Sequence, residues 1–237
     1  SEKNFASMLL LLLKEYGKVN VPMPIPEPET LPRMAILDFH TNVIYEDVDQ
    51  YLSKYKFSNR PLVGILFYGG FHFEQSVVAA RVLAKFIEEK GLGVIPVFCS
   101  DLRYYLAIEK FFFKNKRALI ECLIDLLWFR FAGGPIGGNH TLTFEVLKKL
   151  NVPVLHGIQL SSITLDEWLE SKYGIPPIET VTTVILPELD GRIESTLALA
   201  RVKYKKGDAI FDEYVGIEDR LEKLARRISK WVKLRRR

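Results

Sequence analysis

Apolar and polar positions follow two different periods along this chain of 237 residues. From residue 60 onward, continuous apolar runs alternate with segments whose apolar positions lie three and four residues apart. The first pattern is typical of strands buried on both faces, and the second is typical of amphipathic helices. The expected strands are 61–68, 93–100, 122–131, 152–160, 180–187 and 196–204. The expected helices are 74–91, 101–116, 141–150, 164–174 and 216–234.

This alternation predicts an α/β fold, with a parallel Rossmann-like or flavodoxin-like sheet and helices on both faces. In such folds ligands bind at the carboxyl edge of the strands, near the point where the strand order reverses. The loops expected at that edge are 69–75, 132–140 and 156–164. They are the first places to search for functional side chains.

The first 59 residues have a different pattern. The first sixteen predict a helix that ends at Gly17, and prolines at 22, 24, 26, 28 and 32 then predict a stiff, extended connector. A short helix is expected at 45–55. We therefore predict an N-terminal segment over 1–59 and an α/β domain over 60–237, with a division into two small lobes near residue 150 as an alternative.

Composition limits the class of protein. With 48% hydrophobic and 26% charged residues, the chain is typical of globular proteins. Cys99 and Cys122 lie inside apolar segments, which argues against a disulfide framework and for a reducing compartment. The leucine run at 9–13 is far shorter than the roughly 20 residues of a membrane span. We expect a cytoplasmic protein with no membrane span.

The formal net charge of +4 is unevenly distributed. Residues 220–237 contain nine Lys and Arg and one acid, a charge of +8, so the rest of the chain carries 4 − 8 = −4. A basic end could contact nucleic acid or acidic lipid. Its regular apolar positions instead favour a helix docked on the sheet, and no nucleic-acid partner is expected.

A glycine-rich loop, "GGPIGGNHT" at 133–141, has part of the spacing of a phosphate-binding loop. Gly133 and Gly138 are five residues apart, but Asn139 stands where the phosphate-binding lysine is required. We therefore predict that this chain does not bind ATP.

Histidines gather at the predicted carboxyl edge. His72 and His140 lie in two of its loops, and His156 ends the fourth predicted strand. The fourth histidine, His40, lies elsewhere, and no spacing of histidines or cysteines predicts a structural metal site. A single histidine is more often structural than functional, so the gathering of three is the stronger signal.

The stretch "LPELDGRIE" at 186–194 combines charged residues with a turn-forming Asp-Gly pair. Two interpretations stay open. Glu188 and Asp190 are candidates for proton transfer, or they pair with Arg192 to fix a ligand-facing loop. Fixation of the loop is favoured narrowly, and both carboxylates are kept as catalytic candidates.

The same stretch resembles a signature of the large subunit of cobaltochelatase (CobN type), which the H subunit of magnesium chelatase shares in broad form. Further resemblances occur in the family's order and extend over nearly the whole chain. They are "NFASMLLLLLKEYG" (4–17), "RPLVGILFY" (60–68), "GLGVIPVFCS" (91–100), "LNVPVLHGIQLSSITLDEWLESKYGIPPIE" (150–179) and "RISKWVKLRR" (227–236).

This resemblance implies a part of an enzyme that inserts a divalent metal, cobalt in the CobN branch, into a tetrapyrrole for cobalamin biosynthesis. Cobalt would be the substrate ion, and ATP would be hydrolysed by partner AAA+ subunits. The expected partners are these subunits, the tetrapyrrole and the remainder of the large subunit, so the piece alone is expected to be inactive. Carboxylates and neutral imidazoles suit the removal of pyrrole protons. The substrate-binding candidates are Tyr68, His72, Asn139, His140, His156, Gln159 and Arg192.

Two departures and two alternatives accompany this interpretation. His72 lies about one position from the family's histidine, and the family's usual catalytic residues lie in a C-terminal part that this sequence lacks. The first alternative is a non-catalytic scaffold or docking module of a magnesium or cobalt chelatase complex. The second is an unrelated small-ligand domain or nucleotide-sugar transferase, since fold alone does not fix function.

Overall fold

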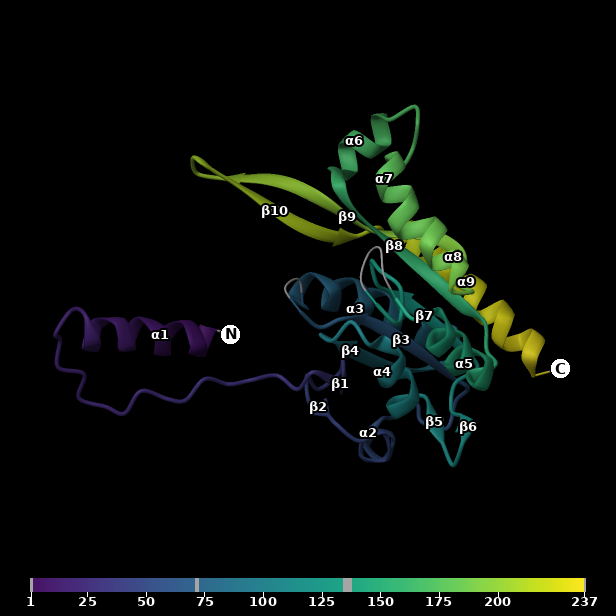
Figure 1. The fold of residues 1–237 in the computed structure, drawn as a ribbon, viewed down its shortest axis with the longest axis horizontal. Coiled ribbons are helices and arrows are strands. Elements are labelled where there is room, and N and C mark those ends of the chain that lie inside the picture. Colours follow the sequence, from purple (N-terminus) through teal and green to yellow (C-terminus); the bar gives the residue numbers. More distant parts are fainter. Residues whose placement is uncertain (1, 71–72, 134–137, 237) are drawn as a thin grey trace. The chain divides into compact units, whose positions relative to one another are not determined.

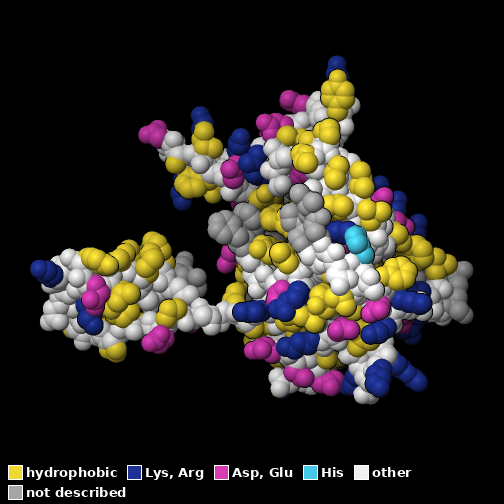
Figure 2. All heavy atoms as spheres, in the orientation of Figure 1, with side chains coloured by type: hydrophobic (Ala, Val, Ile, Leu, Met, Phe, Trp, Pro, Cys, Tyr) yellow, Lys and Arg dark blue, Asp and Glu magenta, His cyan; other side chains and the backbone are white. Residues whose placement is uncertain are grey.

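The computed structural model describes residues 2–70, 73–133 and 138–236, and divides the chain into the compact units Ser1–Pro32 and Arg33–Arg237. In the first unit, the expected N-terminal helix is α1 (Glu2–Glu15). Asn4 and Lys3 on this helix bind Glu29 of the proline-rich segment. Figure 2 shows hydrophobic side chains gathered on the surface of this unit. The exposed apolar side chains on α1 are Phe5, Met8, Leu9, Leu11, Leu12 and Leu13.

The second unit is built on a mixed sheet whose strands, among the described residues, have the order β10-β9-β8-β7-β3-β4-β1-β2 (Figure 1). The pairs β3–β4, β3–β7, β7–β8 and β8–β9 are parallel, and the edge strands pair antiparallel. The parallel strands are β3 (Leu62–Tyr68), β4 (Gly93–Cys99), β7 (Cys122–Leu126), β8 (Val154–Thr164) and β9 (Ile193–Lys206). The remaining strands are β1 (Met34–Leu37), β2 (Ile44–Tyr45) and β10 (Ala209–Gly216).

The five parallel strands follow the flavodoxin-like order 2-1-3-4-5 when numbered along the chain. Of the two predicted sheet types, the structure therefore has the second. The strand order reverses between β3 and β7, so the loops that follow these strands flank the switch point. Every residue of β4 and β7 is buried, as their continuous apolar runs predicted.

Helices cover both faces of the sheet. Helix α3 (Phe73–Glu89) packs beside α9 (Glu218–Arg235), and α4 (Tyr104–Phe111) packs beside α5 (His140–Leu150). Right-handed connections between parallel strands place these pairs on opposite faces. Helix α9 buries Leu221, Leu224, Ala225, Ile228 and Val232 against the core, as expected for a docked helix with a basic outer side.

One predicted strand is wrong. Residues 180–187 form part of a helical segment made of α7 (Pro177–Thr180), the π-helix η1 (Val181–Ile185) and α8 (Leu186–Leu189). The β-branched run "TVTTVI" favoured a strand, but Glu179, Thr183 and Pro187 are buried at a spacing of four. That spacing is helical, and it was missed because two of the three side chains are polar.

Other boundaries also differ from the prediction. The expected helix 101–116 ends at Phe111 and is followed by a small hairpin of β5 (Phe113–Lys114) and β6 (Arg117–Ala118). The expected helices at 45–55 and 164–174 are the shorter α2 (Val48–Lys54) and α6 (Leu165–Glu170). The expected loop 156–164 is a continuation of strand β8.

Residues 33–59 belong to the same compact unit as the sheet. Strand β1 was not predicted, and it pairs antiparallel with β4. Residues 60–237 lie in one compact unit without a division near 150. Among the described residues, no helix has the length and apolar character needed to cross a bilayer.

Candidate functional site

A fully buried ion pair joins the middle of the sheet to the turn before β9. Arg192 Nη1 lies 2.8 Å from Asp125 Oδ1 on β7, and both side chains are completely buried. His156 on the neighbouring strand β8 places Nδ1 2.9 Å from the same oxygen. Burial alone would raise the pKa of Asp125, but the positive charge of Arg192 and the contact with His156 outweigh burial and lower that pKa.

Asp190 extends this network toward the surface. Arg130 Nε donates to Asp190 Oδ1 at 3.0 Å, and the backbone N–H of Phe131 donates to Oδ2 at 3.2 Å. Arg192 Nη2 lies 3.5 Å from the same Oδ2, and the Arg192 guanidinium also stacks on the Phe131 ring at 4.3 Å. Two carboxylates and two guanidiniums therefore compensate each other's charge inside the protein, as buried charges must.

His140 is the member of this network that solvent reaches. Its side chain is 60% exposed, and Nδ1 lies 3.8 Å from Asp190 Oδ1. Arg130 contacts both ring nitrogens, with Nη1 2.6 Å from Nε2. A guanidinium only donates hydrogen bonds, and a neutral imidazole carries one lone pair and one N–H, so Arg130 can donate to only one of the two ring nitrogens. A neutral imidazole can accept a proton or bind a metal ion.

Local backbone features bring these groups together. Gly191 adopts φ +83 and ends α8, and its N–H donates to the carbonyl oxygen of Glu188. This turn directs Asp190 and Arg192 into the protein from the two sides of the glycine. Gly157 follows His156, and a Cβ there would lie 2.4 Å from Leu126 Cδ2, so glycine permits the close approach of β7 and β8.

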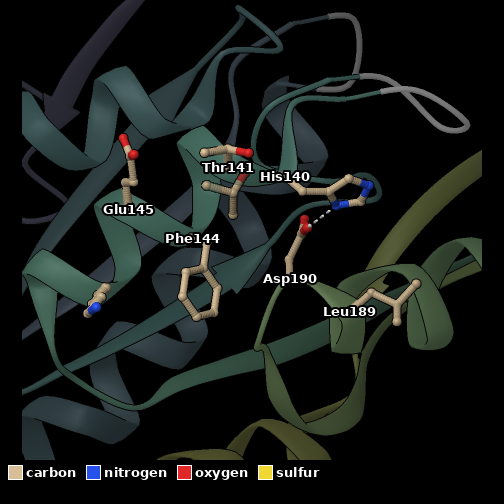
Figure 3. Close-up of a pocket in the computed structure, with 8 residues that line it drawn as sticks. His140, Thr141, Phe144, Glu145, Leu189 and Asp190 are labelled. Atoms are coloured by element: carbon tan, nitrogen blue, oxygen red, sulfur yellow. Dashed lines mark ion pairs between the residues drawn. The ribbon is translucent and has the colours of Figure 1, made fainter.

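A pocket of about 430 Å³ opens over Asp190 and His140. Figure 3 shows these two side chains facing each other, with Phe144 from α5 and Leu189 from α8 on either side of Asp190. Phe144 is 68% exposed, which is unusual for a phenylalanine on a helix that packs on the sheet. The other lining residues are Thr141, Thr143, Glu145 and Lys148.

The structure does not bring all the predicted site residues into this pocket. His140 and Asp190 line it, and Arg192 and His156 lie beneath it in the buried network. The side chain of Glu188 is exposed. Among the described residues it forms no hydrogen bond or ion pair with the network, and it does not line the pocket. Its backbone carbonyl instead accepts the hydrogen bond that closes the turn.

The remaining predicted residues have other contacts. Asn139 caps α5 by accepting a hydrogen bond from Leu142 N–H at 3.3 Å. Gln159 is buried and donates to the carbonyl oxygen of Leu126. Tyr68 packs against Trp128, with ring centroids 5.8 Å apart. His72 lies outside the described residues.

Sequence reasoning missed Asp125, Arg130, Phe144 and Lys148. The signal for the first two was available, because each is a charged residue within an expected buried strand, where a charge requires a partner. No sequence signal marked Phe144 or Lys148, since an amphipathic helix carries such residues on its outer side in any case.

The carboxyl edge of the sheet holds a smaller, aromatic pocket of about 270 Å³. Trp128, Phe129 and Tyr214 line it, and Tyr68 packs on Trp128. Buried Glu179 also lines it, but its carboxylate accepts hydrogen bonds from Ser161 and Ser162. The other residues that line this aromatic pocket are polar, namely Ser161, Thr182 and Thr183, and the pocket over His140 and Asp190 lies beside α5. Among the described residues, no group of three or more His, Cys, Asp and Glu is placed to hold a metal ion.

Comparison with known proteins identifies one family. The model of the CobN/magnesium chelatase family matches residues 1–237. Magnesium-chelatase subunit ChlH, chloroplastic, of Oryza sativa subsp. indica is 27% identical over 205 residues, which are 81% of this chain and 14% of that protein. Aerobic cobaltochelatase subunit CobN of Pseudomonas aeruginosa is 27% identical over 224 residues, which are 89% of this chain and 16% of that protein.

A solved structure has the same fold. The catalytic subunit of cobaltochelatase from Mycobacterium tuberculosis superimposes with a TM-score of 0.68 and 20% sequence identity, and the match covers 99% of this chain and 18% of that one. The chain thus spans less than a fifth of the length of each of these three proteins.

Proposed function

The chain belongs to the CobN/magnesium chelatase family, and we propose that it contributes a tetrapyrrole-binding surface to the large subunit of an ATP-dependent chelatase. The metal inserted would be cobalt, the metal named in the relative aerobic cobaltochelatase subunit CobN, and the product would serve cobalamin biosynthesis. ATP would be bound and hydrolysed by partner AAA+ subunits in the cytoplasm, and this chain would bind no structural metal of its own.

The observation that carries this proposal is the exposed imidazole of His140 above a buried ionic network, beside an exposed aromatic ring. Metal insertion requires the removal of pyrrole protons, and a neutral imidazole is a suitable acceptor. His140 can exchange its contact with Arg130 for one with a ligand, because 60% of its side chain is exposed. Asp190 is engaged by two arginines, so we assign it the positioning of this assembly rather than proton transfer.

The pocket also suits the periphery of a tetrapyrrole. The ring of Phe144 offers an apolar surface for a flat macrocycle. Lys148 lines the pocket, is exposed, and forms no ion pair with any described residue. Its ammonium group is therefore available to a carboxylate on the edge of the macrocycle.

Tryptophan emission tests the proposal and locates the site. Trp231 on α9 lines a second hollow, which shares Phe144, Lys148 and Asp190 with the charged pocket. Trp128 lies in the aromatic pocket at the carboxyl edge. A metal-free corrinoid precursor and a porphyrin are titrated separately into the full chain and into the variants Trp231→Phe and Trp128→Phe. Saturable quenching that Trp231→Phe largely removes supports the site beside α5. No quenching by either compound contradicts the proposal.

Two lysines on α5 provide a matched pair for this titration. Lys148→Gln should weaken tetrapyrrole binding about tenfold, which corresponds to one charge-assisted contact. Lys149→Gln removes the same charge from the next residue, which lies outside the pocket and pairs with Glu109. Equal effects of the two substitutions would mean that only the general charge of the helix matters.

A docking role is the second candidate, and the exposed apolar side chains of α1 favour it. A helix with apolar residues on most of its surface is stable in water only when a partner covers it. If docking is the main function, Leu9→Lys with Leu12→Lys should abolish co-purification with the remainder of a chelatase complex and leave tetrapyrrole quenching unchanged. Retained co-purification would remove this candidate.

A further inference from the structure

The pocket over Asp190 continues into a second hollow of about 470 Å³. Phe144, Lys148 and Asp190 line both, so the two form one groove along α5. The far wall of the second hollow is formed by Trp231 and Arg235 of α9. The shape of the groove therefore depends on where α9 lies relative to the start of β9.

Glu194, at the start of β9, has an unusual backbone conformation. Its φ of +55 lies in the left-handed region, which favours glycine and costs conformational energy for any residue with a Cβ. It lies where the register with β8 shifts, between the pairs Leu155–Ile193 and Gly157–Thr196. A glycine would satisfy this bulge more easily, so the side chain of Glu194 must provide a compensating interaction.

That interaction is a clamp on α9. One carboxylate oxygen of Glu194 pairs with Arg227, and the other accepts a hydrogen bond from Trp231 Nε1 at 3.1 Å. One face of the helix carries Arg227, Trp231 and Arg235, because each follows the previous one by four residues. The clamp therefore holds the same face of α9 that lines the groove. The hydrogen bonds also outweigh the effect of partial burial, which would raise the pKa of Glu194, and lower that pKa.

The charges at this end of the groove favour an anion. Glu121 lies 3.5 Å from Arg235 and 3.4 Å from Arg236, so one carboxylate is shared by two guanidiniums and a net charge of +1 remains. Lys148 adds a second positive charge from the opposite wall. Asp190 also lines the hollow, but Arg130 and Arg192 compensate its charge.

We propose that Glu194 is a positioning residue, which fixes α9 so that Trp231 and Arg235 form a subsite for a carboxylate arm of a tetrapyrrole macrocycle. This inference rests on the proposed function for the identity of the ligand, but the clamp itself does not depend on it. The subsite lies at the amino-terminal ends of β8 and β9, away from the switch point of the sheet.

The clamp is tested first, without ligand. In a background of Trp128→Phe and Trp168→Phe, the emission of Trp231 reports on α9 alone. Glu194→Gly removes the clamp and also relieves the left-handed strain, so the chain should stay folded with an unchanged or higher midpoint of thermal unfolding. Quenching of Trp231 by iodide should rise at least twofold. Unchanged quenching would show that Glu194 does not hold α9 and would overturn the proposal.

The subsite is tested by titrating the full chain with a porphyrin dicarboxylate and its dimethyl ester. Glu194→Gly and Arg235→Gln should each weaken binding of the dicarboxylate about tenfold and change binding of the ester less than twofold. Glu194→Gln, which keeps an acceptor for Trp231 Nε1, should have a smaller effect than Glu194→Gly. Equal losses for the acid and the ester would overturn the carboxylate subsite. A wild-type chain that binds neither compound would overturn the proposed function and the subsite with it, while the iodide measurement still decides on the clamp.

Discussion

Two ion pairs beside the start of β9 hold the two sides of the groove, and they differ in burial. The pair Asp125–Arg192 is completely buried beneath the α5 side. In the pair Glu194–Arg227, which holds the α9 side, the side chains are 26% and 42% exposed. Removing one partner of a buried pair leaves an uncompensated charge, whereas water solvates the remaining partner of an exposed pair. The α5 side is therefore part of the stable core, and the α9 side can be altered without unfolding the protein.

The largest effect should come from breaking the buried pair. Asp125→Ala leaves Arg192 without its main counter-charge and should lower the free energy of unfolding by about 3–5 kcal/mol in urea titrations. Asp212→Ala removes the acid of a more exposed ion pair with Arg201 and should change the free energy of unfolding by less than about 0.5 kcal/mol. The double variant Asp125→Leu, Arg192→Met replaces the pair by apolar groups and should recover much of the loss. A loss below about 1 kcal/mol for Asp125→Ala would contradict the comparison.

The same carboxylate should make stability depend on pH. The pKa of Asp125 is lowered, because Arg192 and His156 outweigh the opposing effect of burial. A carboxylate whose pKa is lowered by folding stabilises the folded protein at pH values above its pKa in the unfolded chain, which is about 3.9. This stabilisation is lost as the pH falls through the pKa of the folded state. The free energy of unfolding should therefore fall below about pH 4, and it should fall less steeply in Asp125→Asn. Parallel pH profiles of the two proteins would contradict this assignment.

A smaller effect separates structure from ligand binding on the α5 side. Asn139→Ala removes the cap of α5 and should cost about 1 kcal/mol of unfolding free energy, whereas Asn139→Asp keeps an acceptor and should cost little. If Asn139 serves only as a cap, tetrapyrrole quenching should be the same in Asn139→Asp and the wild type. Loss of quenching in the folded Asn139→Asp variant would restore Asn139 as a ligand-binding residue.

The smallest effect on stability is expected at the exposed pair. Arg227→Gln removes one contact of the α9 clamp, and the free energy of unfolding should change by less than about 1 kcal/mol, since solvent screens this pair. Urea titrations of Arg227→Gln and Asp125→Ala under the same conditions compare the two losses of unfolding free energy. Similar losses in the two variants would mean that burial does not distinguish the two sides of the groove.

The accuracy of the sequence-based prediction differed between elements for physical reasons. Strands β3, β4 and β7 were predicted because both of their faces are apolar, and α3 and α9 were predicted because each has one apolar face. Strand β10 was missed because most of it is exposed, although Gly207 and Asp208 before it are a recognisable hairpin turn. The helix at 177–189 was missed because the polar side chains of Glu179 and Thr183 form its buried face.

The sequence by itself determined the α/β architecture, the helix and strand periods and membership of the CobN/magnesium chelatase family. Only the tertiary structure decided which charged groups meet. Asp125 and Arg192 are 67 residues apart, and Arg130 and Asp190 are 60 apart. The spacing of apolar residues indicates which side of a helix or strand is buried, but not which distant segment covers it. These ion pairs form because neighbouring parallel strands and the turn at Gly191 bring distant segments together. For the same reason, the strained Glu194 and its contacts with α9 can be found only in the folded protein.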